Sequence, residues 1–579
     1  MLITLTLLTT LSAPAAAADP VLDALEAELN RASEELALEG AERPYYIAYR
    51  LLDVHRVGMT AQLGGLVGYA EQPDRDLGVE VRVGSEVFDN SNFQSNPYDN
   101  DNGFGSTSLV IDDAPMALRH DAWLETDTCY KQAVETLATK QAAARRRAAG
   151  DELPDYVPGP SQSADGGAEP PPDAESMKAR ALQLSEVFLD RPEVERSVVY
   201  SSSETGRRAT LDSAGTRVVE PVGELNVRVI ARGRSEDGAT VVDHASWTVR
   251  GESWLPDTET MVAEAEALAD RVEAWRELPL FEEEYVGPVL FEDDAAVDLF
   301  RYLLLPALQG TPPPEQPSQG SRVIAFSRNT GPSSSTLQVR RRVLPPGFNV
   351  VDDPKADAGL PSAYAYDMEG EPAEAITLVR DGIVRTHYAS RTPGQGAEAS
   401  NGHGRGALNR LIRGQAAITT VEAGRPDRAR RVRREAMQLA ASYDLDHYLV
   451  VRRLSDPSLA GEGGGAMMNI GGSSGPALPA PLAVYRVYAD GREEALRGAA
   501  FASVDARLLR DIVAVGQAQT RTFLQPLDSR GARALGGMPT TLTAPDVLVS
   551  EVVLSPSRAD VERPPKLPNP LGKPLADGE

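Results

Sequence analysis

Three consecutive acidic side chains, at residues 292–294, could hold a metal ion, exchange protons in catalysis, or simply begin a helix. Behind them, apolar residues recur at the spacing of one helical face: Ala296, Leu299, Phe300, Leu303, Leu304 and Leu308. The helix is therefore predicted to begin at or just after the acids. Carboxylates in a first turn accept hydrogen bonds from free backbone N–H groups and complement the positive end of the helix. A helix start alone explains all three acids.

A metal site is the alternative use of these carboxylates. Glu292, Asp293 and Asp298, with a distant His387 or His403, could together hold an ion. Such an oxygen-rich set favours harder ions than zinc. The six histidines include no pair spaced i, i+4 on a helix and no His-Glu-x-x-His motif. We therefore expect no cofactor, and zinc only if this alternative holds.

The segment Ser400–Gly406 reads Ser-Asn-Gly-His-Gly-Arg-Gly and is the best candidate for a binding loop. The alternating glycines allow the backbone to approach a ligand, while the two long side chains are expected to reach outward. Arg405 would take a carboxylate, and His403 would be a polar contact. The predicted substrate-binding residues are Asn401, Gly402, His403, Gly404 and Arg405. A simple turn is the competing interpretation.

A second glycine cluster, at residues 471–475, formally matches the Gly-x-Ser-x-Gly pattern of a nucleophile elbow. That elbow needs a strand before the serine and a helix after it. Here glycines precede the serine and Pro-Ala-Leu-Pro-Ala-Pro follows it. We interpret the cluster as a mobile loop, for example a flap over a groove, rather than as a catalytic centre.

The elements that must position these residues divide the chain into an N-terminal α/β half, with mixed strands and long helices, and a C-terminal β-rich half with a few helices. This is an α+β fold. Residues 60–84 and 209–233 share a glycine turn, a polar gap and a Leu-x-Val-x-Val alternation, which suggests two related strand units. In the β-rich half, helices are expected near 429–443 and 504–515. The predicted regions are a signal peptide (1–18), a first strand unit (19–147), an acidic Pro/Gly-rich linker or long loop (148–177), a second strand unit (178–284), the β-rich domain (285–558) and a Pro-rich tail (559–579).

Composition limits the function classes. The first 18 residues end in a small-residue Ala-x-Ala pattern typical of a secretory signal, so we expect a periplasmic or secreted protein. No later apolar run is long enough for a membrane span. The net charge of −27 argues against nucleic acid, whose binding requires clustered cations. Cys129 is the only cysteine, which excludes an internal disulfide and a structural cysteine–zinc site. We expect it to be a buried, unreactive thiol.

The order of several motifs in the second half resembles the TldD/PmbA family of peptidase-related proteins. The most specific is Tyr-Asp-Met-Glu-Gly-Glu-Pro at 366–372, followed by a strand, Asp-Gly and a second strand. It comes after Val-Val-Asp-Asp-Pro at 350–354 and before the glycine-rich loop at 400–406. Gly-Pro-Val-Leu-Phe at 287–291 leads into a helix, and residues 509–516 with 537–554 are similar to the closing segment of the family.

This resemblance implies a zinc peptidase with His-Glu-x-x-x-His on the helix after residue 291 and a cysteine ligand near the C-terminal end. In this sequence Glu292 and Val297 fall at the two histidine positions and Asp293 falls at the glutamate. No cysteine follows Cys129. Zinc prefers nitrogen and sulfur ligands, so the expected zinc site is absent. Members of the PmbA type also lack the motif and pair with a TldD-like partner.

Three functions remain open from the sequence. The leading hypothesis is a degenerate peptidase or non-catalytic partner that binds peptide or protein substrates, by strand addition to a sheet edge, as a homodimer or beside a TldD-like protein. The second is an active metallopeptidase with a non-standard metal site. The third is a non-enzymatic assembly or structural factor of the cell envelope.

Overall fold

The structure is a computed structural model of the 579-residue chain. It describes residues 19–94, 102–145, 153–312, 314–315, 337–394, 396–424, 427–457, 459, 478–502, 504–525, 537–557 and 569–572. The predicted signal peptide, the glycine cluster at 471–475 and most of the predicted tail lie outside these residues, and these three interpretations stay predictions.

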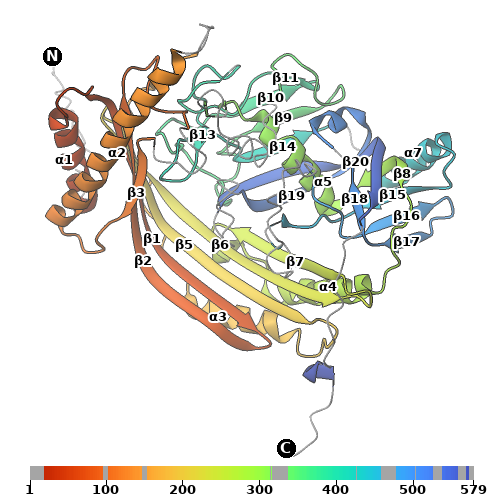
Figure 1. Cartoon of the computed structure of the whole chain (residues 1–579). Helices are drawn as coiled ribbons and strands as arrows, with labels where there is room; N and C mark the ends of the chain where they lie inside the picture. The colour runs from red at the N-terminus through yellow and green to blue at the C-terminus, as the bar shows by residue number, and fades with distance from the viewer. Residues whose placement is uncertain are drawn as a thin grey trace, which may run out of the picture.

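The N-terminal half forms one seven-stranded sheet with the order β3-β2-β1-β5-β6-β4, with β7 also paired to β6. Its strands are β1 (Pro44–Gln62), β2 (Gly65–Val83), β3 (Phe104–Ser108), β4 (Ser163–Asp165), β5 (Arg196–Asp212), β6 (Arg217–Arg234) and β7 (Thr240–Val249). The similar stretches 60–84 and 209–233 contain the turns and second strands of two long hairpins, β1–β2 and β5–β6. These hairpins lie side by side in Figure 1.

Four helices cover one face of this sheet. Apart from Asp53 and His55, the side chains of β1 that point to that face are apolar and alternate along the strand: Ile47, Tyr49, Leu51, Val57, Met59 and Ala61. Helices α1 (Pro20–Glu35) and α2 (Pro115–Ala144) pack on the first part of the strand. Helices α3 (Ala174–Glu186) and α4 (Thr258–Arg276) pack near its end (Figure 1). Cys129 on α2 is buried in this layer, as expected.

The opposite face of the sheet is polar and lies against the C-terminal half. Arg50 Nε donates to the carbonyl of Met368 at 2.8 Å. Glu220 accepts the backbone N–H groups of Ala365 and Tyr366, each at 3.1 Å. Strand alternation therefore directs apolar side chains to the helices and charged side chains to the junction between the two halves.

The predicted linker enters this junction in its described part. Tyr156 is buried, its N–H donates to the carbonyl of Glu86, and the N–H of Val157 donates to the carbonyl of Arg391. Residues 163–165 form β4, which pairs with β6, and α3 begins at Ala174. Residues 153–173 therefore form a long loop that these contacts anchor to the rest of the protein.

The C-terminal half forms an eleven-stranded sheet with the order β11-β10-β9-β14-β20-β8-β15-β16-β17, with β18 and β19 also paired to β20. Its strands are β8 (Tyr285–Phe291), β9 (Asn349–Asp352), β10 (Ile376–Arg380), β11 (Ile383–Val384), β14 (Ile418–Glu422), β15 (His447–Val451), β16 (Val484–Tyr488), β17 (Glu493–Leu496), β18 (Ala499–Phe501), β19 (Ile512–Gln525) and β20 (Met538–Pro556). Strands β12 (Gly404–Arg405) and β13 (Arg413–Gly414) pair separately. The fold is α+β, as predicted.

Helices α5 (Asp293–Leu303) and α7 (Ala429–Ser442) are the longer helices of the described C-terminal half. The predicted helix over 504–515 is wrong. A short 3-10 helix spans Ala506–Asp511, and β19 begins at Ile512. The run Ile-Val-Ala-Val can pair with β20, and this tertiary pairing overrides the local helical pattern. None of the described helices combines the length and apolar character that crossing a bilayer requires.

Candidate functional site

The predicted binding loop at 401–405 lies inside the C-terminal half. The side chains of His403 and Arg405 are 0% and 3% exposed, so the expectation that they reach outward is wrong. Asn401 donates to the carbonyl of His387 at 2.9 Å and accepts from the N–H of Ala389 at 3.0 Å. Its side chain thus mimics a strand partner for residues 387–389.

The charged groups of this loop bind the protein itself. Arg405 donates to the backbone carbonyls of Ala416 and, at 2.7 Å, Pro539. Both ring nitrogens of His403 face acceptors, with Nε2 at 3.1 Å from Asp352 Oδ1. Burial opposes the charge on Asp352, but hydrogen bonds from His403, Thr419 and the backbone hold its pKa below the ordinary value. The geometry favours a structural turn, and a ligand contact at Asn401–Arg405 stays a prediction.

The glycines of this loop allow close approach to the protein's own carboxylates. A Cβ at Gly404 would lie 2.6 Å from Glu369 Oε2 and 2.8 Å from Asp367 Oδ2. Gly402 has φ +72°, and a Cβ there would lie 2.2 Å from the carbonyl oxygen of Pro372. The loop therefore packs directly on the Asp-Met-Glu-Gly-Glu-Pro motif at 367–372.

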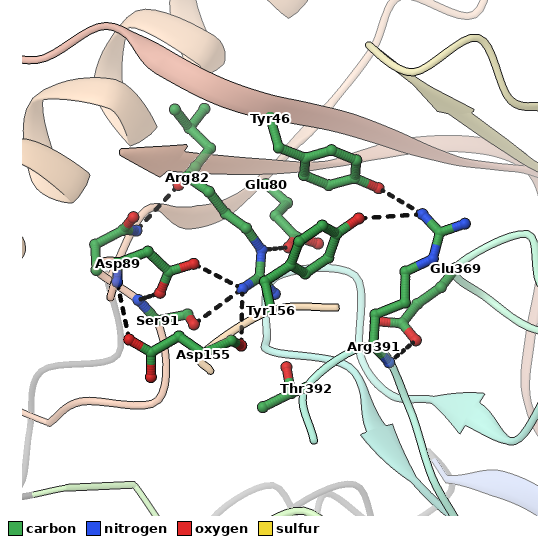
Figure 2. A network of polar contacts seen from close by, with 12 residues as sticks. Tyr46, Glu80, Arg82, Asp89, Ser91, Asp155, Tyr156, Glu369, Arg391 and Thr392 are labelled. Atoms are coloured by element: carbon green, nitrogen blue, oxygen red, sulfur yellow. Dashed lines mark hydrogen bonds and ion pairs between the residues drawn. The ribbon is translucent and has the colours of Figure 1, made fainter. Parts of the chain in front are cut away.

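That motif meets the N-terminal half through Arg391, which is 2% exposed. Arg391 donates to Glu371 at 2.8 Å and to Asp212 of β5 at 3.3 Å, and its backbone N–H donates to Glu369 at 2.7 Å. It also donates to the hydroxyls of Tyr46 and Tyr156, as Figure 2 shows. One guanidinium thus joins three segments that are distant in sequence.

The contacts of Arg391 form one part of a buried polar network, and Arg82 is the centre of the other part (Figure 2). Its guanidinium contacts Glu80, Asp89 at 2.9 Å and Ser91 at 3.0 Å. It also lies 4.4 Å from the ring of Tyr156. Because all of these charges are buried, the pairing is required to offset their lost hydration.

The carboxyl groups of the network differ in charge. Burial raises the pKa of Glu369 to about 8, and the neighbouring Asp367 adds to this rise. Burial also raises the pKa of Asp367 to about 6, although three backbone N–H groups donate to it. Burial disfavours charge on Glu80 as well, but Arg82 and Arg50 lower its pKa to about 2. The raised pKa of Glu369 favours its protonated form at neutral pH, whereas the lowered pKa of Glu80 favours its ionised form.

The acids at 292–294 do stand at a helix start, because α5 begins at Asp293. The Glu292 side chain makes no capping hydrogen bond, and Asp546 accepts from the N–H of Asp293 at 3.2 Å instead. The expected self-capping is therefore wrong in detail. Burial and the charges of Glu292 and Asp293 raise the pKa of Asp546 to about 6.

Arginines from distant parts of the chain, on α7, after β15 and on β19, hold the acids of this region. Glu292 pairs with Arg433 and Arg452, each at 3.3 Å. Arg521 pairs with Asp294 at 3.3 Å and with Asp298 at 3.2 Å. These ion pairs occupy Glu292 and Asp298, two of the three carboxylates that the sequence offered as metal ligands.

A cavity of about 510 Å³, here called the α5 cavity, opens beside these pairs. Strand β7 forms one wall with residues 244–247, and the start of α5 forms another. The charged lining consists of Arg271, Arg452, Arg453, Arg521, Glu264, Asp293 and Asp294. The aromatic lining consists of Trp247, Trp275 and Tyr485. Such a mixture of aromatic surface and fixed polar groups is typical of ligand sites.

The residues present do not fit the family zinc site. Val297, at one expected histidine position, is buried in the hydrophobic core, and Glu292, at the other, is held by two guanidinium groups. His387 and His403 have partners elsewhere, Leu337 and Asp352. In the described part of the chain no three His, Cys, Asp or Glu side chains come together as a metal site.

Sequence reasoning missed the arginines and aromatic residues of the α5 cavity. Arg452 and Arg453 directly follow β15, which lies parallel to β8, and β8 leads into α5. Adjacent parallel strands bring their following residues to the same sheet edge. Only the strand order shows that β15 lies beside β8, and the sequence pattern does not predict that order.

The two sheets and their helices define an α+β fold, and the comparisons agree with it. Residues 283–454 match the PmbA/TldA metallopeptidase C-terminal domain. A candidate modulator of DNA gyrase from Thermotoga maritima has a TM-score of 0.56 at 12% identity, covering 92% of this chain and 100% of that one. TldE from Thermococcus kodakarensis has a TM-score of 0.53 at 14% identity, with 92% and 100% coverage. No curated protein matches the sequence.

A further candidate gyrase modulator, from Bacteroides thetaiotaomicron, has a TM-score of 0.54 at 11% identity and covers 92% of this chain and 98% of that one. Residues 283–454 therefore resemble the C-terminal domain of the PmbA/TldA family, and these solved structures share the fold of the whole chain.

Proposed function

We propose that this protein is an exported member of the TldD/PmbA family that binds peptides in the α5 cavity without the family's zinc chemistry. The observation that carries the proposal is the ion pairing of Glu292 and Asp298 with arginines, beside a cavity large enough for a ligand. The signal sequence at residues 1–18 supports export, and a periplasmic or secreted location follows from it.

Strand β7 offers a way to bind a peptide backbone. Among the described strands it pairs only with β6, so its other edge has free backbone groups except where Arg453 donates to the carbonyl of His244. An extended peptide could add to this edge and place its side chains against Trp247 and Tyr485. Burial and the nearby Arg228 keep the pKa of His244 well below its usual value, so its ring is neutral at neutral pH.

A bulky substitution in the cavity tests peptide binding. Ser246 is exposed on β7 and lines the cavity, so Ser246→Trp should fill it without disturbing a buried group. We expect peptides from an extended library to bind the variant at least tenfold more weakly by fluorescence anisotropy. Thr240→Trp, at the exposed start of β7 outside the cavity, is the matched control. Peptide binding that Ser246→Trp leaves intact, or the absence of any binding by the unmodified protein, contradicts the proposal.

Metal analysis separates this proposal from an active metallopeptidase. Purified protein incubated with zinc should retain well under one ion per chain after dialysis, because guanidinium groups hold the carboxylates. Glu292→Gln should leave that low content unchanged. Stoichiometric metal that is lost together with peptidase activity on chelation would establish the metallopeptidase instead.

Partnership is tested separately. We propose that the chain forms a homodimer or pairs with a TldD-like protein, as its resemblance to the PmbA type implies. Light scattering of the purified protein and co-purification with exported TldD-like proteins distinguish these two states. A monomer that retains no such protein contradicts both.

A further inference from the structure

A second cavity, of about 600 Å³, lies away from the α5 cavity and shares no lining residue with it. Its walls are the segment 169–173 before α3, the loop 250–254 after β7, and the loop 357–359 of the C-terminal half. Ser203 and Thr205 of β5 and Leu225 of β6 also line it. We call it the Trp254 cavity.

Two hydroxyl groups of this cavity lack partners. Ser203 and Thr205 are 4% and 5% exposed, and neither side-chain oxygen makes a hydrogen bond within the described residues. A buried hydroxyl without a partner costs about 1–3 kcal/mol. Because both residues line the cavity, a bound ligand could supply the missing hydrogen bonds.

The charge of the lining disfavours anions. Four carboxylates line the cavity, those of Glu169, Asp173, Glu252 and Asp357, against one guanidinium, that of Arg250. Glu169 pairs with Arg250 at 2.7 Å, and Glu252 pairs with Arg180 at 3.0 Å, so Asp173 and Asp357 carry the excess charge. Asp173 and Asp357 accept backbone N–H groups, which do not neutralise them. The excess negative charge favours a cationic ligand.

The remaining walls are apolar and rigid. Trp254 is 56% exposed, and a Cβ at Gly359 would lie 2.5 Å from its ring, so the loop 357–359 supports one side of the indole. Three consecutive prolines, at 170–172, form a wall with restricted backbone freedom. Leu225 adds an aliphatic surface. Aromatic faces attract cations, and aliphatic surfaces pack against alkyl chains.

We propose that the Trp254 cavity binds a primary ammonium group on an aliphatic stem, as a lysine side chain presents it. An ammonium group carries three donors and no acceptor, which suits the two free hydroxyl oxygens and a carboxylate. The stem would pack on Leu225, the prolines and Trp254. A quaternary ammonium has no N–H donor and would leave both hydroxyls without partners. This inference does not depend on peptide binding in the α5 cavity.

Calorimetry with Nα-acetyl-lysine N-methylamide tests the proposal on the full chain. The double variant Ser203→Ala/Thr205→Val should bind this probe at least tenfold more weakly. Its melting temperature should stay unchanged or rise, because the removed hydroxyls have no hydrogen-bond partner among the described residues. Ser201→Ala is the matched control: this hydroxyl is also buried and without a partner on β5, but it lies outside the cavity. It should leave binding unchanged.

Three further probes define the chemistry. Butylamine should bind, since it carries a primary ammonium group on an aliphatic stem without the rest of the amino acid. The Nε-acetylated lysine probe has nearly the same shape without the charge and should bind at least tenfold more weakly. Glycine methylamide carries an amine without the stem and should also bind poorly. The proposal is overturned if the acetylated or glycine probe binds as tightly as the lysine probe, if the double variant binds normally, or if the unmodified protein binds no lysine probe.

Discussion

The glycine-rich loop at 400–406 has the sequence of a ligand site but packs inside the protein. The start of α5 has the sequence of an ordinary helix start but borders a cavity. The loop has the glycines and cations of a ligand site, yet Arg405 is buried and binds backbone carbonyls. The α5 acids resemble an ordinary helix start, yet they border a cavity of about 510 Å³ with four arginines. The difference teaches that alternating glycines signal close approach of a backbone, whether to a ligand or to the protein's own Asp367 and Glu369.

Removing Arg391 should give the largest effect and is the strongest test of this comparison. Arg391→Ala leaves Asp212 and Glu371 buried without their cation, so we expect a loss of about 3–5 kcal/mol in the free energy of unfolding. Arg452→Ala beside the α5 cavity, where the guanidinium is 25% exposed, should cost about 1 kcal/mol or less. Urea unfolding of both variants makes the comparison. Equal losses in the free energy of unfolding would show that the ion pairs of Arg391 and those beside the α5 cavity do not differ in their contribution to stability.

Arg405→Ala should have the next largest effect. The substitution removes two charge-assisted hydrogen bonds to carbonyls that would stay buried, and we expect a loss of about 2–4 kcal/mol. The melting temperature should fall, while affinity for peptides at the α5 cavity stays the same. If instead peptide binding weakens by about 1.5–3 kcal/mol and the melting temperature is unchanged, the loop is a binding site after all.

The buried carboxyl pair beneath the loop should make stability depend on pH. Since the folded-state pKa of Glu369 is raised from 4.5 to about 8, the folded protein holds a proton that the unfolded chain releases. The free energy of unfolding should therefore fall as pH rises from about 4.5 to about 8, by on the order of 5 kcal/mol. Asp367, raised to about 6, contributes in the same direction over the lower part of this range.

Glu369→Gln isolates this contribution, because the amide keeps an oxygen for the N–H of Arg391 and has no proton to lose. Its urea unfolding, measured at several pH values, should show a flatter decline than that of the unmodified protein. A decline of the same steepness would mean that Glu369 is not the group that holds the proton.

Local sequence patterns predicted the helices and strands better than they predicted which strands pair. The spacing of Leu299, Phe300 and Leu303 correctly gave α5, and the alternation in the two similar stretches correctly gave strands of one sheet. The stretch 504–515 failed because pairing with β20, a tertiary contact, decides its structure. Local pattern cannot report such long-range pairing.

The same limit applies to the sites. Asp294 and Arg521 are 227 residues apart in sequence and pair at 3.3 Å. The local sequence around either residue does not predict this contact, because β19 brings the arginine to α5 only when the sheet is assembled. The Trp254 cavity likewise combines the first and second halves of the chain. Sequence reasoning could name the acids and the motif at 367–372, but not what each contacts.

The smallest effect is expected for Arg433→Gln, at the outer edge of the α5 pairs. Arg433 contacts Glu292 and Glu493, each at 3.3 Å, and its side chain is 41% exposed. Arg452 pairs with the same two acids, so neither acid loses its last cation. We expect a loss of about 0.5 kcal/mol, which shrinks further in high salt because exposed pairs are screened. Urea unfolding at low and high ionic strength measures it. A loss above about 2 kcal/mol that salt does not change would place Glu292 in a buried network like that of Arg391, and the contrast between the two regions would then disappear.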